Sequence, residues 1–300
     1  MAWDVVSKYK LDMSGKTDNV AALLALSVDM AQRRAVGLPL PQLDFSEGVL
    51  AFSKWPDLAF SRLHMVAHGQ CVLKHIGAGD AVVFDGSLHP NACWDMQFDN
   101  FFVLPGPQTQ NSLVLNEIHW SVFRKVGVQG AGPPTGAALY SGLVQHWCVS
   151  TRFDDFNCLV NDAAELSAQT FNCNGIWLDG PMPARAKVQA AGPTTMALFI
   201  NTNISLVDNG IVLNNANNAM FINGAVQGTN KIGMLINKSG YSRVMNVDFE
   251  SNKGLDIHTV AGQAHSNKIW RPGNISAWKL KLDGWNNTVV ADVQDGMFGM

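Results

Sequence analysis

The sequence has little charge and no paired cysteines. Charged residues make up 15% of its 300 residues, and the formal net charge at pH 7 is -3. The five cysteines are odd in number and lack the CxxC or CxxxC spacing of zinc sites and redox dithiols. We therefore expect them to be small core residues, and they are Cys71, Cys93, Cys148, Cys158 and Cys173.

We expect no signal peptide and no membrane span from this sequence. The opening segment MAWDVVSKYKLDMSGK carries charges where a signal peptide needs an apolar stretch. No later run approaches the ~18 apolar residues of a membrane span. No ligand cluster or phosphate loop is recognisable, so we expect no metal ion, no cofactor, no nucleic-acid partner and no membrane insertion.

What the sequence has is an internal repeat. The stretch GIVLNNANNAMFINGAVQGTNKIGMLINKSG, residues 210–240, contains one pattern twice: apolar, any, apolar, then asparagine. Similar strands that end in a polar residue recur at intervals of 18 to 35 residues, which is typical of the coils of a parallel β-solenoid. The expected polar ends are Asp85, Asn116, Ser141, Asn161, Asp179, Asn214, Asn237, His258 and Asp283.

The residues within each coil predict how the coils stack. Asparagine or aspartate at a sharp turn tolerates left-handed backbone angles and can hydrogen-bond the same turn of the next coil. A second apolar strand, about eight residues before each polar end, predicts an inward stack. Residues 180–195, with three prolines, are expected to leave the barrel as a loop. The expected inward stack is Phe153, Phe171, Leu206, Val226, Phe249 and Ile275.

The N-terminal segment predicts a cap for the solenoid. GKTDNVAALLALSVDMAQRR favours a helix from roughly Asp18 to Arg34, with Thr17 or Asp18 as the N-cap. An open solenoid end exposes strand edges, so a helix is needed to cover it. We expect residues 1–40 to form this cap and residues 41–300 to form the β-helix domain. The expected apolar face of the helix is Val20, Leu23, Leu24, Ser27, Val28 and Ala31.

The order of these segments resembles a known family. The cap helix, then LDFSEGVLAFSK, then LAFSRLHMVAHGQCVLKHIG, is similar to the start of the pectate-lyase-like right-handed β-helix proteins of phage tailspikes and polysaccharide-degrading enzymes. Residues 15–19 are a thin version of that family's Gly-Asp-Gly-x-x-Asp-Asp-Thr cap, and residues 46–50 lack the proline and tyrosine of its Pro-x-Gly-x-Tyr motif.

The resemblance and the repeat together give one expected fold. It is all-β, a single-stranded right-handed parallel β-helix of about nine coils with an N-terminal capping helix. The resemblance also implies an extended carbohydrate that lies along or between solenoids and is cut by carboxylates or by a Lys, Arg or His base.

The first candidate catalytic pair is in the stretch NVDFESN. With Val247 and Phe249 inward, Asp248 and Glu250 face outward at i and i+2, about 6.5 to 7 Å apart at their Cα atoms. That separation is compatible with the acid and base of an inverting glycosidase. Solvated outward acids are also common on any solenoid strand, and this alternative stays open.

Two further constellations are weaker candidates. Asp256 and His258 are expected to face outward one strand later, where a histidine beside a carboxylate suits β-elimination from a uronate. His258 also occupies a polar end, which favours a structural role. Asp154 precedes Asp155, and adjacent residues of a regular strand point to opposite sides. We place Asp154 four rungs, about 19 Å, from Asp248.

Basic and aromatic residues gather in the same coils. Between Lys231 and Lys281 eight lysines and arginines stand against three acids. Exposed aromatic rings can stack on sugars, although core or interface packing explains a tryptophan equally well. The candidate substrate-binding residues are Lys253, Arg271, Lys281, Trp177 and Trp270.

Two functions from different classes fit these features. One is a phage tail-associated depolymerase that cleaves a bacterial surface polysaccharide (capsule, exopolysaccharide or O-antigen) by glycoside hydrolysis or uronate β-elimination. The other is a non-catalytic β-helical virion or receptor-binding protein. Both are consistent with synthesis in the host cytoplasm and a place in the virion tail with other tail proteins, and an extracellular location is the alternative. Outward Val212, Leu235 and Trp177 favour a parallel homotrimer.

Overall fold

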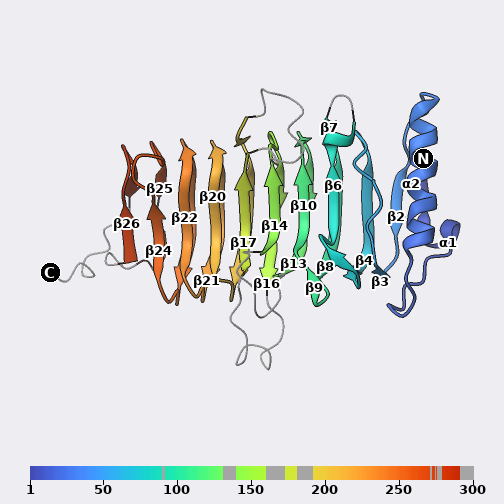
Figure 1. Ribbon diagram of the computed structural model, residues 1–300, viewed down its shortest axis with the longest axis horizontal. Coiled ribbons are helices and arrows are strands. Elements are labelled where there is room, and N and C mark those ends of the chain that lie inside the picture. Colours follow the sequence, from blue (N-terminus) through green and yellow to red (C-terminus); the bar gives the residue numbers. More distant parts are fainter. Residues whose placement is uncertain are drawn as a thin grey trace.

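The protein is a right-handed parallel β-helix, as Figure 1 shows. The computed structural model describes residues 1–89, 92–130, 140–159, 173–180, 192–270, 272–273, 275 and 279–290. Strands stack side by side along the long axis, and all pairings between named strands in the described part are parallel. The predicted fold class is therefore confirmed.

Sheet 1 is the longer of the two main sheets. Among the described residues it has 14 strands, of which eleven form one continuous path. In path order these are β1 (Ala2–Asp4), β2 (Gln42–Phe45), β4 (His64–His75), β8 (Gln97–Leu104), β12 (Val122–Arg124), β15 (Arg152–Asp154), β19 (Leu198–Ser205), β21 (Met220–Gln227), β23 (Arg243–Glu250), β25 (Lys268–Trp270) and β27 (Thr288–Val290). Beside the path lie β3 (Gly48–Phe52), β13 (Gly127–Gln129) and β16 (Asn157–Leu159).

Sheet 2 forms another wall of the same helix. Within the described ranges its path has eight strands. Each coil contributes one strand to each path, so the expected number of about nine coils lies between the eight strands of sheet 2 and the eleven of sheet 1. The strands of the sheet 2 path are β6 (Val82–Asp85), β10 (Asn111–Asn116), β14 (Tyr140–His146), β17 (Cys173–Asp179), β20 (Asn209–Asn217), β22 (Ile232–Gly240), β24 (Leu255–Thr259) and β26 (Leu280–Leu282), with β18 (Thr194–Thr195) beside β20. Two short pairs are β7 (Cys93–Trp94) with β11 (Ile118–His119) and β5 (Ala78–Gly79) with β9 (Gln108–Thr109). The 3-10 turn η1 spans Gly86–Leu88.

The predicted cap helix is present, but its N-cap and buried face differ from expectation. α2 (Val20–Ala35) covers the N-terminal end beside β2, next to the short α1 (Val5–Tyr9). Its N-cap is Asn19, not Thr17 or Asp18. The Asn19 side chain caps no helical N–H, and its Nδ2 donates to the carbonyl of Ala51, which ties the helix start to β3. The buried side chains are Leu23, Leu26 and Met30, whereas the expected core residues Leu24 and Val28 are 46% and 53% exposed.

Stacked phenylalanines fill the core. Phe123, Phe153, Phe199 and Phe221 occupy the same place in successive strands of sheet 1, with ring centroids 4.7, 4.9 and 4.8 Å apart and planes within 10°. This spacing is that of the strands themselves, so each ring packs face to face on the next. The stack is fully buried.

The predicted inward stack is wrong in part, because it combines residues from two separate inward columns of sheet 1. Phe153 belongs to the phenylalanine column, but Val226 and Phe249 belong to a second inward column that includes Cys158 and Ile204. Leu206 lies outside the strands at a positive φ of 62°, and Ile275 is half-buried. Phe171 falls outside the described residues.

The cysteines are buried, as expected. All five are free thiols in the core, and burial raises the pKa of Cys71, Cys93, Cys148 and Cys173 to about 12. Burial also holds the pKa of Cys158 well above its usual value. Because the thiolate is the reactive form, these side chains serve as small apolar residues.

The polar ends do stack and hydrogen-bond between coils. Asn237 Nδ2 donates to Asn214 Oδ1 at 2.8 Å, and Asn214 Nδ2 donates to Asp179 Oδ2 at 3.0 Å. Asn116 Nδ2 donates to Asp85 Oδ1 at 2.8 Å in an earlier coil. The predicted contact between coils is confirmed for these residues.

The prediction is wrong for two polar ends, Ser141 and His258. Ser141 pairs with Asn111 and Asn174 at the start of the strands, and His146 occupies the column between Asn116 and Asp179. His258 pairs with Leu235 and Lys281, in the middle of the outward face, because its coil continues for two residues beyond the expected end. The end expected at Asn161 lies outside the described residues, as do most of residues 180–195.

Left-handed residues occur at other positions than the polar ends. Asn214 and Asn237 have ordinary backbone angles, whereas Asn201, Asn223 and Asn246 have φ of 54°, 57° and 53°. These three bend successive strands of sheet 1 at one shared level. Asparagine is therefore used for left-handed geometry here, but inside sheet 1 and not at the ends of the strands of sheet 2.

The phenylalanine column provides a test of the core. Phe199→Ala is expected to lower the free energy of unfolding by about 3 to 5 kcal/mol, because it opens a cavity between two stacked rings. Chemical denaturation monitored by circular dichroism measures this. Leu24→Ala, on the exposed face of α2, should change stability by no more than about 0.5 kcal/mol. Equal losses in the two variants would contradict the assignment of the core.

Candidate functional site

The first predicted pair, Asp248 and Glu250, lies on β23 with the expected alternation. Val247 and Phe249 are buried, Asp248 is half-buried and Glu250 is exposed. Gly273 of the following coil lies against Asp248, since a Cβ atom there would come within 2.9 Å of Asp248 Oδ1. Asp248 is therefore partly covered and Glu250 is open to solvent, and their catalytic role stays a prediction.

Asp256 does not face outward as expected. It is 1% exposed, and its Oδ1 accepts a hydrogen bond of 2.9 Å from Asn252 Nδ2. It follows a column of glycines, Gly175, Gly210 and Gly233, where an added side chain would meet the inward residues of sheet 1. Its carboxylate therefore points into the interior and cannot contact a polysaccharide.

His258 is outward but has a polar neighbour on the next strand. Its Nε2 lies 3.8 Å from Asp283 Oδ2, and Lys281 Nζ lies 3.3 Å from the same oxygen. Burial and the charge of Lys281 lower the pKa of His258 below its usual 6.5, and Asp283 opposes this. The imidazole is thus neutral at pH 7 and is separated from the buried Asp256.

Asp154 lies on the outward face of β15. Its Oδ1 accepts a hydrogen bond of 2.8 Å from Arg152 Nε. Asp155 adopts a left-handed φ of 59° and ends the strand, so neither carboxylate faces inward. The path from β15 to β23 is three rungs, not four, because residues 173–180 belong to sheet 2. The axial separation from Asp248 is therefore about 14 Å.

The candidate substrate-binding residues are dispersed. Lys253 Nζ donates to Asn230 Oδ1 at 2.8 Å, and Trp177 Nε1 donates to Asp179 Oδ2 at 3.0 Å on sheet 2. Trp270 is half-buried on β25 of sheet 1. Lys281 is paired with Asp283 as described above, and Arg271 lies outside the described residues.

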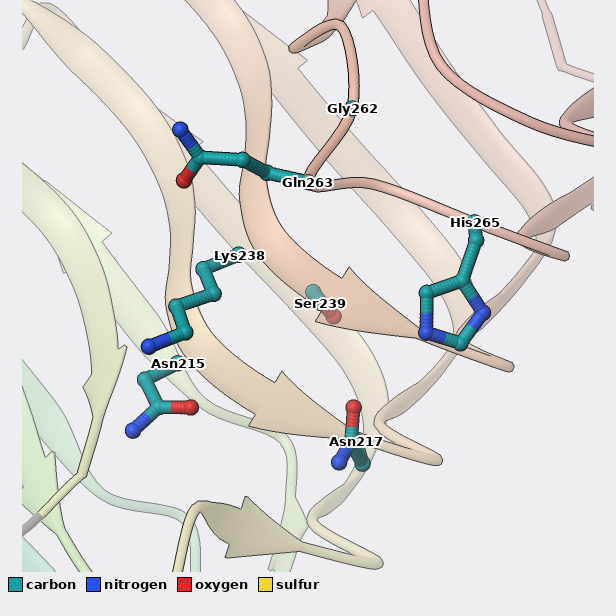
Figure 2. Close-up of a pocket in the computed structure, with 7 residues that line it drawn as sticks. All are labelled: Asn215, Asn217, Lys238, Ser239, Gly262, Gln263 and His265. Carbon is teal, nitrogen blue, oxygen red and sulfur yellow. The ribbon is translucent and has the colours of Figure 1, made fainter.

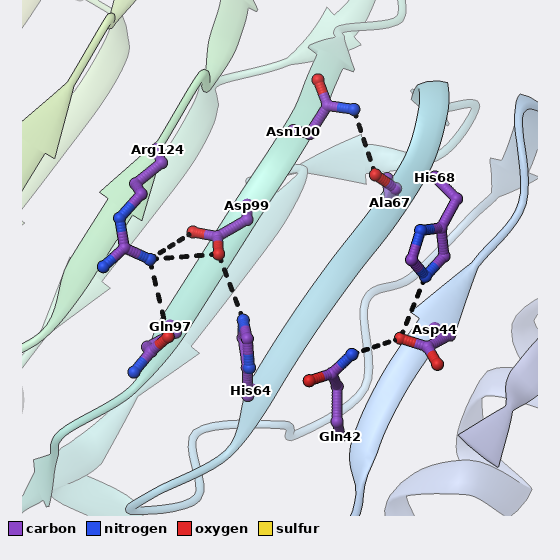
Figure 3. A network of polar contacts seen from close by, with 9 residues as sticks. All are labelled: Gln42, Asp44, His64, Ala67, His68, Gln97, Asp99, Asn100 and Arg124. Atoms are coloured by element: carbon purple, nitrogen blue, oxygen red, sulfur yellow. Dashed lines mark hydrogen bonds and ion pairs between the residues drawn. The ribbon is translucent and has the colours of Figure 1, made fainter. Parts of the chain in front are cut away.

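A charged cluster that the sequence analysis missed lies on the outward face of sheet 1, over β2, β4, β8 and β12 (Figure 3). Asp99 Oδ2 lies 3.1 Å from both His64 Nε2 and Arg124 Nη1. Asp44 Oδ1 lies 3.2 Å from His68 Nε2 and accepts a hydrogen bond of 2.7 Å from Gln42 Nε2. We call these five charged or titratable residues, Asp44, His64, His68, Asp99 and Arg124, the charged face.

The register of sheet 1 spaces the carboxylates evenly. Asp44 pairs with Val66, Val66 with Asp99, Asp99 with Arg124, and Arg124 with Asp154. Asp44 and Asp99 are thus two rungs apart, about 9.6 Å between Cα atoms, with only Val66 between them. Inverting glycosidases hold their two carboxyl groups about 6.5 to 9.5 Å apart. The Cα spacing of Asp44 and Asp99, close to the upper end of that carboxyl range, makes the two residues candidates for an acid and a base acting through water.

A bulge in β4 gives this face a second histidine. The register with β8 shifts between Val66 and Cys71, and Gly69 has a φ of 85°. Asn100 Nδ2 holds the bulge by donating to the carbonyls of Ala67 and Gly69, at 3.0 and 2.6 Å. The bulge leaves the His68 side chain 65% exposed beside Asp44.

One sequence signal could have pointed to this cluster. His64 and His68 have HxxxH spacing, but Asp44, Asp99 and Arg124 come from other coils, and only the register brings them together. The two histidines bind different carboxylates. In the described part of the chain no group of three or more His, Cys, Asp or Glu side chains is arranged to hold a metal ion. No helix in that part is both long and apolar enough to span a membrane.

Comparison with known proteins supports the fold. No protein-family model and no curated protein matches the sequence. The surface adhesin PfbA of Streptococcus pneumoniae is 11% identical, with a TM-score of 0.61 and coverage of 96% of this chain and 77% of that chain. Geobacillus virus E2 ORF18 is 15% identical, with a TM-score of 0.62, and the match covers 95% of this chain and 59% of that chain.

More distant structures have the same fold. The Dettilon tailspike protein is 10% identical, with a TM-score of 0.49 and coverage of 97% of this chain and 68% of that chain. Mannuronan C-5 epimerase modules of Azotobacter vinelandii and a galactohydrolase also match. The β-helix neighbours therefore include phage tailspikes, polysaccharide enzymes and an adhesin. The likeness to PfbA and to ORF18, both under 25% identical, shows the parallel β-helix fold alone.

The environment of His258 gives a titration test. Lys281→Gln should raise the pKa of His258 toward 6.5, because it removes a positive charge that disfavours the imidazolium. Asp283→Asn should lower it, since the carboxylate favours the charged form. The pH dependence of the His258 ring resonances in NMR spectra measures both. Lys253→Gln is the control, and no shift in the Lys281 variant would contradict the arrangement.

Proposed function

We propose that this protein is a phage tail-associated depolymerase that binds a bacterial surface polysaccharide on the N-terminal strands of sheet 1 and cleaves it there, at the charged face. The observation that carries the proposal is the pair Asp44 and Asp99, two rungs apart with His64, His68 and Arg124 around them. The likeness in fold to a virus protein supports the virion location, and a straight solenoid suits an extended sugar chain.

In the hydrolytic mechanism, Asp99 serves as the base. Arg124 and His64 hold its carboxylate in place, and Asp99 takes a proton from the water that attacks the anomeric carbon. Asp44 is the general acid of this mechanism and donates a proton to the glycosidic oxygen as the bond from that oxygen to the anomeric carbon breaks. Val66 lies between the two carboxylates and gives the sugar ring an apolar floor.

The same residues also support β-elimination from a uronate. Arg124 would neutralise the uronate carboxylate, and His64 would take the C5 proton through Nδ1, because its Nε2 faces Asp99. The C4–C5 double bond forms as the 4-linked oxygen leaves and takes a proton from water. Product analysis separates the two routes, because only elimination gives an unsaturated uronate that absorbs ultraviolet light. Both routes release a new reducing end.

The proposed pair can be tested against the pair predicted from the sequence. Asp44→Asn and Asp99→Asn should each slow cleavage of the host polysaccharide by about two to four orders of magnitude, the usual loss on removal of a general acid or base. Asp248→Asn and Glu250→Gln are matched controls on β23 and should cleave at the wild-type rate. Reducing-end assays measure all four. The reverse result would place the chemistry at Asp248 and Glu250.

A non-catalytic receptor-binding protein is the second candidate, and one observation favours it. Asp99 is held by His64 and Arg124, and Asp154 by Arg152, so these carboxylates already have charged partners. Such pairs can be structural. If the wild type binds host cells but yields no new reducing ends from any host polysaccharide, this second function holds.

We further propose a parallel homotrimer, on other residues than those first expected. Val212 is only 3% exposed, so the expected strip on sheet 2 is not open at that position. One outward column of sheet 1 is apolar after β15, and the column beside it is apolar at Leu198 and Met220 before it becomes basic at Arg243 and Lys268. The apolar positions follow the axis, so each copy can present the same strip to its neighbours. These residues are Leu198, Ile200, Met220, Ile222, Met245 and Trp270.

The oligomeric state tests this strip. Light scattering should give a trimer for the wild type and a monomer for the double variant Met220→Glu, Met245→Glu, because two buried charges per copy oppose association. Met196→Glu, a 51% exposed position outside the strip, is the control and should remain trimeric. A wild-type monomer at micromolar concentration would disprove the trimer.

A further inference from the structure

A polar pocket opens on the opposite half of the solenoid from the charged face. It has a volume of about 490 Å³ and lies over the ends of β20 and β22 and the turn that follows β24 (Figure 2). Every lining residue is polar or glycine, and none is acidic. They are Asn215, Asn217, Lys238, Ser239, Gly262, Gln263 and His265.

The register and one glycine form this pocket. Asn215 pairs with Lys238, and Asn217 with Gly240, so alternate side chains of the two strands face the same opening. Gly240 leaves room for the ring of His265 on the next coil, since a Cβ atom at residue 240 would lie 2.3 Å from His265 Cε1. The turn with Gly262 and Gln263 forms the other rim in Figure 2.

Several polar groups of the pocket have no protein partner among the described residues. Asn217 Oδ1 accepts from the backbone N–H of Gly240 at 2.9 Å, but its Nδ2 has no acceptor there. Lys238 forms no ion pair with a described residue, and the Gln263 side chain has no hydrogen bond in that part of the chain. The nearby column of Asn237, Asn214 and Asp179 is satisfied from coil to coil. The pocket thus has hydrogen-bond donors without a described protein partner, whereas the neighbouring Asn and Asp column pairs its donors between coils.

Two exposed aromatic residues adjoin the pocket residue His265. Tyr241 is 55% exposed, and its ring meets that of His265 edge-on, with centroids 5.1 Å apart. Trp285 is 71% exposed and lies on the coil after His265, to which its backbone is bridged. Large aromatic side chains at such exposure stabilise no core, and their flat faces suit the apolar face of a sugar ring.

We propose that this pocket is a non-catalytic subsite for an anionic sugar residue of a glycan. Lys238 pairs with the carboxylate or sulfate group, the amides of Asn217 and Gln263 bind hydroxyl oxygens, and Trp285 stacks on the ring. Tyr241 precedes β23, which is five rungs from β8, so the subsite lies about 24 Å along the axis from Asp99. The proposal shares only its ligand class with the proposed function and does not require cleavage.

Calorimetric titration of the full chain with defined oligosaccharides tests the subsite. The probes are three tetrasaccharides. The one from polygalacturonate carries uronate groups, the one from a sulfated galactan carries sulfate groups, and maltotetraose carries no charge. At least one of the two anionic probes should bind more tightly than the neutral one, with an affinity that falls as salt rises. Lys238→Gln should weaken anionic binding about tenfold or more, the scale of one lost charged hydrogen bond.

Matched variants separate the pocket from the rest of the surface. Trp285→Ala should weaken binding of the same probe, whereas Trp120→Ala, a 61% exposed tryptophan on another coil, should not. All three substitutions are at exposed side chains, and thermal unfolding should match the wild type. Equal affinity for neutral and anionic probes, no binding at millimolar concentration, or unchanged affinity in both the Lys238 and Trp285 variants would overturn the proposal.

The outcome is distinguishable from that of the cleavage assay. Asp99→Asn should leave binding of the anionic tetrasaccharide at the pocket unchanged, because the two places are far apart. If Asp99→Asn abolishes cleavage and leaves pocket binding intact, the result tests the proposed role of the charged face and not the subsite. Loss of pocket binding in Lys238→Gln, with cleavage retained at saturating polysaccharide, concerns the subsite alone.

Discussion

Backbone hydrogen bonds between successive coils set the register on which the core and the surface of this protein depend. Two residues before a strand of sheet 1, the chain turns through a left-handed residue whose N–H donates to the next coil, as Met196 does to Asn217 at 3.0 Å and Tyr241 to His265 at 3.1 Å. These residues have φ of 54° and 59°, which costs roughly 1 to 2 kcal/mol for a residue other than glycine. The repeated bond holds each coil over the last, so one register extends along the solenoid. The corner residues include Asp95, Trp120, Ser150, Met196, Asn218, Tyr241, Ser266 and Asn286.

A fixed register turns sequence differences between coils into surface zones. On the outward face of sheet 1, one column changes from Asp44, Asp99 and Arg124 at the N-terminal end to Ile200 and Met245 farther along. The same backbone therefore presents a charged zone and an apolar zone without any change of fold. The phenylalanine column fills the core in each coil, so the outward side chains can differ from coil to coil without changing the packing of the core.

The sequence predicts the fold better than the site for a physical reason. Strand period and polar ends are local patterns, and even with Ser141 and His258 misassigned the coils remain recognisable. A site on a solenoid depends on which residues share a column, and insertions of unequal length between coils hide that register. Asp44 and Asp99 are separated by a full coil and the β4 bulge, so their alignment follows only from the pairing of both with Val66.

The solenoid also determines what kind of ligand can use both the charged face and the polar pocket. They lie about 24 Å apart along the axis, so no single sugar spans them, and a compact ligand would occupy one at a time. Only a ligand that extends along the axis is long enough to reach both. Its second contact is then intramolecular, and two weak sites give a combined affinity far above either one. A binding subsite on a separate coil would thus keep a long chain on the protein while a bond is cut elsewhere.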